Sequence, residues 1–271
     1  MNIYGNSCTY VSTDEKLRMK FFYLLFGERA VELLAREAGS KAVVAHGPVE
    51  RLRPLLKNLF VSNLDELSCL AADYSQPIRR AVADSCGVLC YEEVSEEHRE
   101  RIASAKGDWF IFDGLDEHFN AARSMLLQAC LAFGYTTLGA NCRGFFHTPG
   151  ACVPRHCDEL DVVILQLFGR RRWRMEPNSY PPVGIWDPVR VSHEGDSFWD
   201  SAFGKASKTV ELSPGSVMYV PGGYWHQTRS RGFSFSLTLG LPGVAADPIG
   251  RERFLEEETR QRRRRPSTKN S

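Results

Sequence analysis

The sequence lacks a charge excess of either sign, because 34 basic residues are balanced by 33 acidic ones. This balance argues against binding of nucleic acid through a global positive charge, so no nucleic-acid partner is expected. The sequence also lacks an apolar run of the roughly 18 residues that cross a bilayer, and its first residues lack the basic start and apolar stretch of a secretory signal. We therefore expect a cytoplasmic protein with no membrane partner.

The eight cysteines include no CxxC pair, so the usual signature of a zinc-binding cysteine array is missing. In a reducing compartment such cysteines are expected to be thiols rather than disulfides. What remains is an ordinary globular composition, with 43% apolar and 25% charged residues. A chain of 271 residues is long enough for one catalytic domain with helical additions.

Residues 1–137 are expected to form a mainly helical part that packs on the core. Apolar residues recur at helical intervals from Asp14 to about Ala38, and amphipathic segments follow over residues 48–133. Between them, the short apolar run KAVVAHG predicts a strand near residues 41–46.

Residues 138–245 have a different composition and pattern, with short runs rich in Val, Ile, Phe, Tyr and Thr separated by Pro, Gly, Asn and Asp. Strands at this spacing, such as DVVILQLF, SVMYVP and FSFSLTLGL, predict an antiparallel sandwich or barrel. Residues 246–271 return to a helical pattern and end in a polar basic tail, which contains the run from Arg262 to Arg265 and is expected to be disordered. The fold class is therefore α+β.

A set of metal ligands is the most informative feature of the sequence. In PRHCDELDVVILQLF, His156 and Asp158 stand at the mouth of a strand, and alternation places both on one face. In GSVMYVPGGYWHQ, His226 follows another strand and a Pro-Gly-Gly turn. Two imidazoles and one carboxylate occupy one face of an octahedron, which suits Fe(II) that must keep positions for a cosubstrate and dioxygen.

A family resemblance rests on these motifs. The run NCRGFFHTPGACVPRHCDELDVVILQLFGRRRWRM, with VELSPGSVMYVPGGYWHQ and SFSLTLG, resembles the cupin-like branch of the JmjC oxygenases that includes the ribosomal oxygenases. The resemblance covers about residues 141–240 and implies a double-stranded β-helix, the jelly-roll or cupin core. It also implies Fe(II) bound by His156, Asp158 and His226, with 2-oxoglutarate as cosubstrate.

The resemblance assigns a role to Arg171, because a basic residue on the strand after the HxD hairpin holds the distal carboxylate of 2-oxoglutarate in this family. The residues agree with this assignment. After a hairpin turn expected at Gly169 and Arg170, alternation places Arg171 and Trp173 on one face and Arg172 on the other. A guanidinium suits bidentate capture of a carboxylate.

Two further residues are candidates for binding the cofactor. Ser234 shares one parity with Ser236 and Thr238 on FSFSLTLG, which predicts a hydroxyl-lined inner face of the core. Asn141 is expected to line the same cavity. For both Asn141 and Ser234, a structural hydrogen bond is the alternative interpretation.

The resemblance implies a 2-oxoglutarate-dependent dioxygenase that hydroxylates an unactivated carbon, with a peptide or protein side chain as the first choice of substrate. A free amino acid or natural-product intermediate is the alternative. Ribosomal oxygenases carry a further C-terminal winged-helix region, whereas only about thirty residues follow SFSLTLG here, which puts recognition of a ribosomal protein in question. A non-oxygenase metal-binding cupin, an isomerase or ligand sensor, is the alternative from another class. The sequence leaves open whether the N-terminal helices form a homodimer interface.

Overall fold

The computed structural model describes residues 19–28, 40–83, 89–177, 185–186, 203, 205 and 207–242. Residues 19–28 form a helix inside the helical region expected from Asp14 to Ala38, and the rest of that region lies outside the described residues. The expected C-terminal helix and basic tail, residues 246–271, also lie outside them. Within these ranges, no helix has both the length and the hydropathy needed to cross a membrane.

Helices and strands alternate irregularly in the first half of the chain, and strands dominate the second. The helical elements are η1 Val49–Leu52, α2 Arg53–Leu56, η2 Lys57–Leu59, α3 Leu64–Asp73, η3 Glu96–Ser104, α4 Leu115–His118 and α5 Asn120–Phe133, where η marks a 3-10 helix. The strands are β1 Val43–Ala45, β2 Ile78–Ala83, β3 Leu89–Glu93, β4 Trp109–Phe112, β5 Asn141–His147, β6 Cys152–Cys157, β7 Asp161–Glu176, β8 Ile185–Trp186, β9 Lys208–Leu212, β10 Val217–Val220 and β11 Trp225–Leu241.

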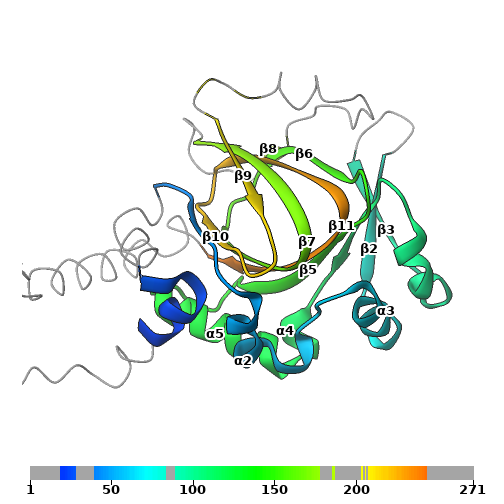
Figure 1. Ribbon diagram of the computed structural model, residues 1–271, viewed down its shortest axis with the longest axis horizontal. Coiled ribbons are helices and arrows are strands. Elements are labelled where there is room, and N and C mark those ends of the chain that lie inside the picture. The colour runs from blue at the N-terminus through cyan, green and yellow to red at the C-terminus, as the bar shows by residue number, and fades with distance from the viewer. Residues whose placement is uncertain are drawn as a thin grey trace, which may run out of the picture.

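The strands form a barrel of two facing layers (Figure 1). One layer contains β5, the C-terminal half of β11, the N-terminal half of β7, and β10. The other contains β6, the N-terminal half of β11, the C-terminal half of β7, and β9. Because β7 and β11 each run through both layers, the architecture is the expected double-stranded β-helix.

The first layer continues beyond the barrel on both sides. β1, which lies within the range 41–46 where a strand is expected, pairs with β10, while β4, β2 and β3 follow β5 in that order. β2 and β3 stand beside the barrel in Figure 1. The expected boundary after residue 137 falls between α5 and β5, but the β4–β5 pairing carries one sheet across it.

The description of the N-terminal part as mainly helical is thus incomplete, since β2, β3 and β4 are strands. β4 is only four residues long and buried throughout, and a short apolar run has no periodicity that separates a strand from a helix. The segments expected as helices are also shorter than anticipated. Residues 49–59 divide into three short helical pieces, and residues 96–104 form a 3-10 helix.

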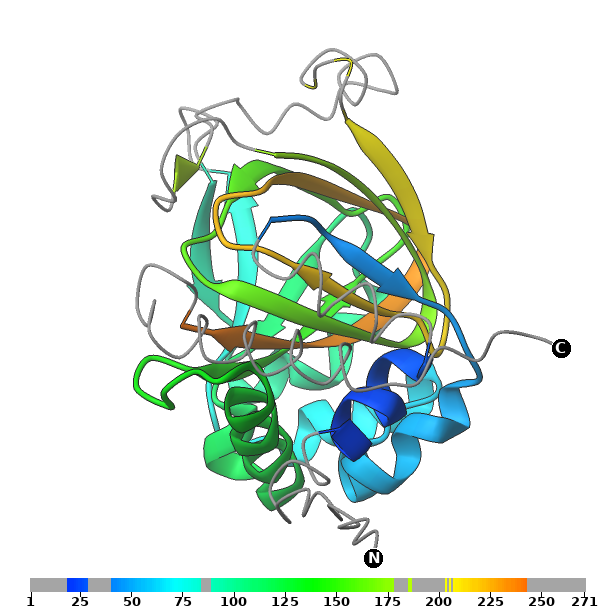
Figure 2. The same cartoon turned by 90° about the vertical axis from the view of Figure 1, so that its left-hand side faces the viewer.

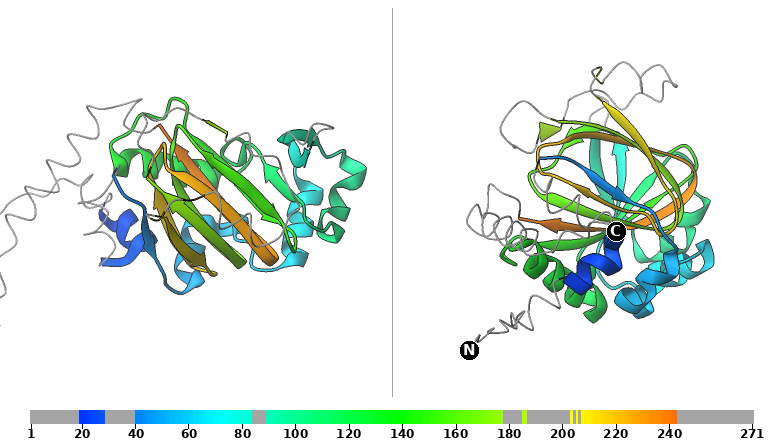
Figure 3. Two further views of the ribbon diagram at one scale, coloured as in Figure 1. Left: turned by 90° about the horizontal axis from the view of Figure 1, so that it is seen from above. Right: turned by 60° about the vertical axis from the view of Figure 1, so that its left-hand side comes forward.

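The helices pack on the outer face of the first layer, as Figures 2 and 3 show. A chain of aromatic rings joins the two: the Phe22 ring meets Phe133 of α5 edge-on at 5.0 Å, and Phe133 stacks on Tyr219 of β10 at 5.3 Å. All three side chains are nearly inaccessible to solvent. Full burial of such a ring stabilises the fold by about 1.5 to 3 kcal/mol, so these contacts hold the helices against this face of the sheet. The opposite face, inside the barrel, is where a cavity forms.

A bend at Gly169 lets β7 pass from one layer to the other. Gly169 has a φ of 66°, and a Cβ there would lie 1.9 Å from the carbonyl oxygen of Phe233. The β7–β11 register also shifts here, because Arg171 pairs with Ser230 and Gly169 with Ser234. The hairpin turn expected at Gly169 and Arg170 is therefore wrong: the glycine serves a bulged bend within one continuous strand.

Gly169→Ala should destabilise the fold by about 2 to 3 kcal/mol, since alanine adds backbone strain and a clash with a neighbouring strand. The free energy of unfolding from urea denaturation measures this. Gly232→Ala is the matched control in β11, because a Cβ there meets no atom within 4 Å, and it should change stability by less than about 0.5 kcal/mol. Equal stabilities for the two variants would contradict the role of Gly169 in the bend.

Candidate active site

Three side chains with metal-binding atoms meet at one end of the barrel. His156 lies on β6, Asp158 directly follows that strand, and His226 is the second residue of β11. The β6–β11 pairing places His226 opposite His156. One ligand atom from each of the three residues lies within 4.8 Å of the others. The sequence therefore predicted a set that the fold brings together.

Both imidazoles are held in the orientation that a metal ligand requires. The Nδ1 atom of His156 lies 2.8 Å from the carbonyl oxygen of Pro154, and that of His226 lies 3.0 Å from the carbonyl oxygen of Tyr224. If each Nδ1–H donates to its carbonyl, each Nε2 keeps a lone pair for a metal. The Nε2 atoms lie 3.9 and 3.6 Å from the oxygens of Asp158.

The electrostatics of His156 also favour a neutral ligand. Burial, followed by the positive charge that His226 can carry, lowers the pKa of His156 from 6.5 to about 4, against the opposing effect of Asp158. At neutral pH His156 is thus an unprotonated imidazole, and its contact with Asp158 is not an ion pair. A neutral imidazole is the form that binds metal ions.

A cavity of about 420 Å³ opens beside these three residues. Its walls come from the inward-facing residues of the barrel strands, and they include Val162 and Ile164 of β7 and Thr228 of β11. His156, Asp158 and His226 all face it, as does Arg171 from the second half of β7. The space therefore joins the metal-ligand set to a buried guanidinium.

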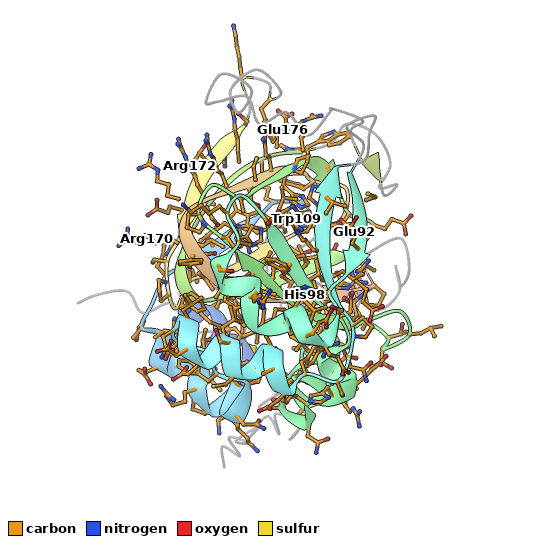
Figure 4. The ribbon with its side chains drawn as sticks, turned by 90° about the vertical axis from the view of Figure 1, so that its right-hand side faces the viewer. Glu92, His98, Trp109, Arg170, Arg172 and Glu176 are labelled. Atoms are coloured by element: carbon orange, nitrogen blue, oxygen red, sulfur yellow. The ribbon has the colours of Figure 1, made fainter. Side chains whose placement is uncertain are left out.

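Arg171 is a buried cation with no counter-charge among the described residues. Its side chain is 3% exposed, and burial lowers its pKa from the usual arginine value to about 9. Its terminal nitrogen contacts the Nδ1 of His147 and lies 3.4 Å from the carbonyl oxygen of Phe145, but no Asp or Glu of the described residues pairs with it. Its Nε is buried with no hydrogen-bond partner. Arg170 and Arg172, by contrast, are exposed and project outward in Figure 4.

Comparisons with known proteins agree with this geometry. Residues 115–246 match the family described as the JmjC domain. This part of the chain is similar to a JmjC domain.

Relatives of the JmjC domain align over part of their length. Ribosomal oxygenase 2 from Mus musculus is 32% identical over 90 residues, which cover 33% of this chain and 17% of that protein. Ribosomal protein uL16 3-hydroxylase from Escherichia coli (strain K12) is 30% identical over 96 residues, which cover 35% of this chain and 24% of that protein. The aligned part thus spans less than a quarter of either relative.

Solved structures support this fold. The X-ray structure of E. coli YcfD superposes with a TM-score of 0.52 at 19% identity, covering 88% of this chain and 68% of that one. YcfD in complex with cobalt and 2-oxoglutarate superposes with a TM-score of 0.50 at 20% identity, covering 80% of this chain and 52% of that one. At these identities the likeness concerns the fold.

The two other candidates from the sequence have different positions in this part of the chain. Asn141 lines the cavity, as expected. Ser234 does not: it is fully buried, and its hydroxyl lies 3.3 Å from the side-chain nitrogen of Gln166. The structural hydrogen bond is therefore the better description of Ser234. Ser236, two residues further on, has a buried hydroxyl without a protein partner.

Sequence reasoning missed the wall of the cavity that β2, β3 and β4 contribute. Arg79, Tyr91 and Trp109 come from these strands and line the space, and Arg143 joins them from β5. Figure 4 marks the position of Trp109 on β4. The available signal was WFIF, a β-prone run, but its pairing with β5 depends on contacts distant in sequence.

His156→Ala and Asp158→Ala should each weaken Mn(II) binding by more than about 100-fold, because changes around metal ligands alone already cost ~10- to 100-fold. Both variants should stay folded, since the two residues face a cavity. Titration followed by the paramagnetic signal of Mn(II), with circular dichroism for folding, measures this. His98→Ala is the control: His98 is exposed, with its Nδ1 2.7 Å from the hydroxyl of Ser95. Unchanged Mn(II) affinity in folded Asp158→Ala would remove Asp158 from the ligand set.

Proposed function

We propose that this protein is an Fe(II)- and 2-oxoglutarate-dependent oxygenase that hydroxylates an unactivated carbon of a peptide or protein side chain. The observation that carries the proposal is the buried, uncompensated Arg171 in the same cavity as His156, Asp158 and His226. A metal site alone would fit many cupins, whereas a metal site with a buried cation fits a chelating dicarboxylate.

The donor set fits iron. His156, Asp158 and His226 would hold Fe(II), because two neutral imidazoles and one carboxylate form the facial set that leaves positions open on an octahedral ion. The backbone contacts of Pro154 and Tyr224 fix both rings before the metal arrives. Bound iron and 2-oxoglutarate supply the oxidising chemistry, while the chain binds, orients and shields the reactants.

The environment of Arg171 fits the distal carboxylate of 2-oxoglutarate. A charge buried without a partner is costly, and a carboxylate that forms a bidentate contact removes that cost. His147 is itself buried, and burial followed by the charge of Arg171 lowers its pKa well below 6.5. A neutral His147 accepts a hydrogen bond from Arg171 without competing for the anion. The guanidinium is thus oriented while its charge stays available.

The substrate class is supported by the relatives and by the size of the cavity. Ribosomal protein uL16 3-hydroxylase and ribosomal oxygenase 2 are named for reactions on ribosomal proteins. A cavity of about 420 Å³ is large enough for one side chain beside a small cosubstrate, since ligand cavities span roughly 300 to 1,000 Å³. The cytoplasmic location stays a prediction from the sequence, which leaves a homodimer open.

A direct test of the reaction is to incubate the iron-loaded protein with 2-oxoglutarate and peptide or metabolite extracts of its host. We expect succinate to accumulate and one component to gain the mass of one oxygen atom. Asp158→Ala is the control, because it removes a proposed iron ligand. A mass gain in free metabolites alone would replace the protein substrate with a small one, and no succinate under any condition would favour a non-oxygenase cupin.

Arg171→Ala should weaken 2-oxoglutarate binding by roughly 30- to 150-fold, which corresponds to about 2 to 3 kcal/mol for a shielded charge-assisted contact. Mn(II) affinity should change little, because no metal ligand is lost. Arg172→Ala, on the exposed face of the same strand, is the matched control and should bind normally. The measurement is a calorimetric titration of 2-oxoglutarate with Mn(II) in place of Fe(II). If the parent protein does not bind 2-oxoglutarate, the isomerase or ligand-sensor interpretation replaces the oxygenase.

A further inference from the structure

A second cationic group lies in the cavity, separate from Arg171. Arg79 of β2 and Arg143 of β5, here called the arginine pair, share the carboxylate of Asp113. Arg79 donates to both oxygens of Asp113, one of them at 2.9 Å from a terminal nitrogen. The Nε of Arg143 lies 3.0 Å from an oxygen of Asp113. No role in the proposed reaction described above uses these residues.

The strand order explains how residues so distant in sequence meet. β4 lies between β2 and β5, and Asp113 directly follows β4. Both arginines line the cavity, whereas Asp113 is not among its lining residues and is the least exposed of the three, at 21% of its side chain against 33% and 42%. Asp113 therefore ties together two arginines that both line the cavity, while it is not itself part of the cavity wall.

The arginine pair carries more positive charge than its partner neutralises. Two guanidinium groups share one carboxylate, and the atom of Arg143 nearest to Asp113 is its Nε. In the described part of the chain, no further ion pair and no hydrogen bond involves the terminal nitrogens of Arg143, a residue that lines the cavity, so their donors are available. The exposed Glu159 also lines the cavity, but it forms no ion pair with either arginine in that same part. Paired N–H donors in a plane match a carboxylate.

Aromatic contacts hold Arg79, one member of the arginine pair, in place. The guanidinium carbon of Arg79 lies 4.9 Å from the centre of the Tyr91 ring, and Tyr91 meets Trp109 edge-on at 5.7 Å. Both rings line the cavity. A cation that stacks on an aromatic face and pairs with a fixed carboxylate has little freedom left, so it presents its donors in one orientation.

We propose that the arginine pair binds a carboxylate of the substrate and thereby selects substrates with an acidic group close to the oxidised carbon. This inference rests on the proposed oxygenase function and deepens it, because it names the substrate chemistry. A lysine or arginine side chain is disfavoured in this part of the cavity, since like charges repel. The carboxylate is a side-chain carboxylate, which belongs either to an acidic residue of a peptide or to a free acidic amino acid.

The test compares probes that differ only in charge. They are blocked pentapeptides of glycine with a central Asp, Asn or Lys, together with free aspartate and free asparagine. Each is titrated calorimetrically into the parent protein loaded with Mn(II) and 2-oxoglutarate under anaerobic conditions. We expect an Asp probe to bind roughly 10-fold or more tightly than its Asn counterpart, the effect of a charge-assisted hydrogen bond. A preference seen in the peptides assigns the carboxylate to a peptide, and one seen only in the free acids assigns it to an amino acid; either supports the inference.

Variants assign the effect to the arginine pair. Arg143→Gln should abolish the preference for Asp over Asn while 2-oxoglutarate and Mn(II) bind as in the parent. Arg143→Lys, which keeps the charge but loses the planar fork, should retain part of it and guards against misfolding of Arg143→Gln. Arg80→Gln is the matched control from β2, because Arg80 is exposed, pairs with Asp108 at 3.1 Å and does not line the cavity. It should keep the full preference.

The outcomes separate this inference from the proposed function. If the parent binds 2-oxoglutarate but shows no preference for Asp, or prefers Lys, the carboxylate site is overturned and the oxygenase assignment stands. The same holds if folded Arg143→Gln keeps the parent's preference. If the parent binds no 2-oxoglutarate, the proposed function fails, and the preference of the metal-loaded protein for Asp over Asn then tests the arginine pair by itself.

Discussion

The bend of β7 at Gly169 is the constraint on which the rest of the structure depends. It allows β7 and β11 to belong to both layers of the barrel, so the two layers share their longest strands. Val162 and Ile164, before the bend, and Arg171, after it, then line the same cavity. The bend requires glycine, because Gly169 has a positive φ and a Cβ there would clash with the carbonyl oxygen of Phe233.

The cavity contains two arrangements of positively charged side chains, which differ in burial and in their contact with a carboxylate. Arg171 is buried and pairs with no carboxylate among the described residues. Its positive charge would therefore be neutralised only when an anion binds. The arginine pair is partly exposed and shares the carboxylate of Asp113, so one of its two positive charges is neutralised. The first arrangement suits a small cosubstrate that is fully enclosed, and the second suits a group that enters from the solvent side.

Local alternation explains which features of the site could be predicted. The period of two in a strand places His156 with Asp158, and Arg171 with Trp173, whatever the neighbouring strands are. The same reasoning failed for Ser234, because parity says which face a side chain shares but not what lies opposite it. Gly169 is the cross-strand partner of Ser234 on β7, and the side-chain nitrogen of the nearby Gln166 donates to the Ser234 hydroxyl at 3.3 Å.

The sequence by itself predicted the double-stranded β-helix, the grouping of His156, Asp158 and His226, and the inward face of β7, because each depends on short-range patterns and on motifs specific to one family. The tertiary structure alone decided that β2, β3 and β4 extend the sheet and that Asp113 brings Arg79 and Arg143 together. Those contacts join segments far apart in the chain. β2 and β3 are short and partly charged, so their pairing in the sheet that β4 joins to β5, rather than local propensity, selects their conformation.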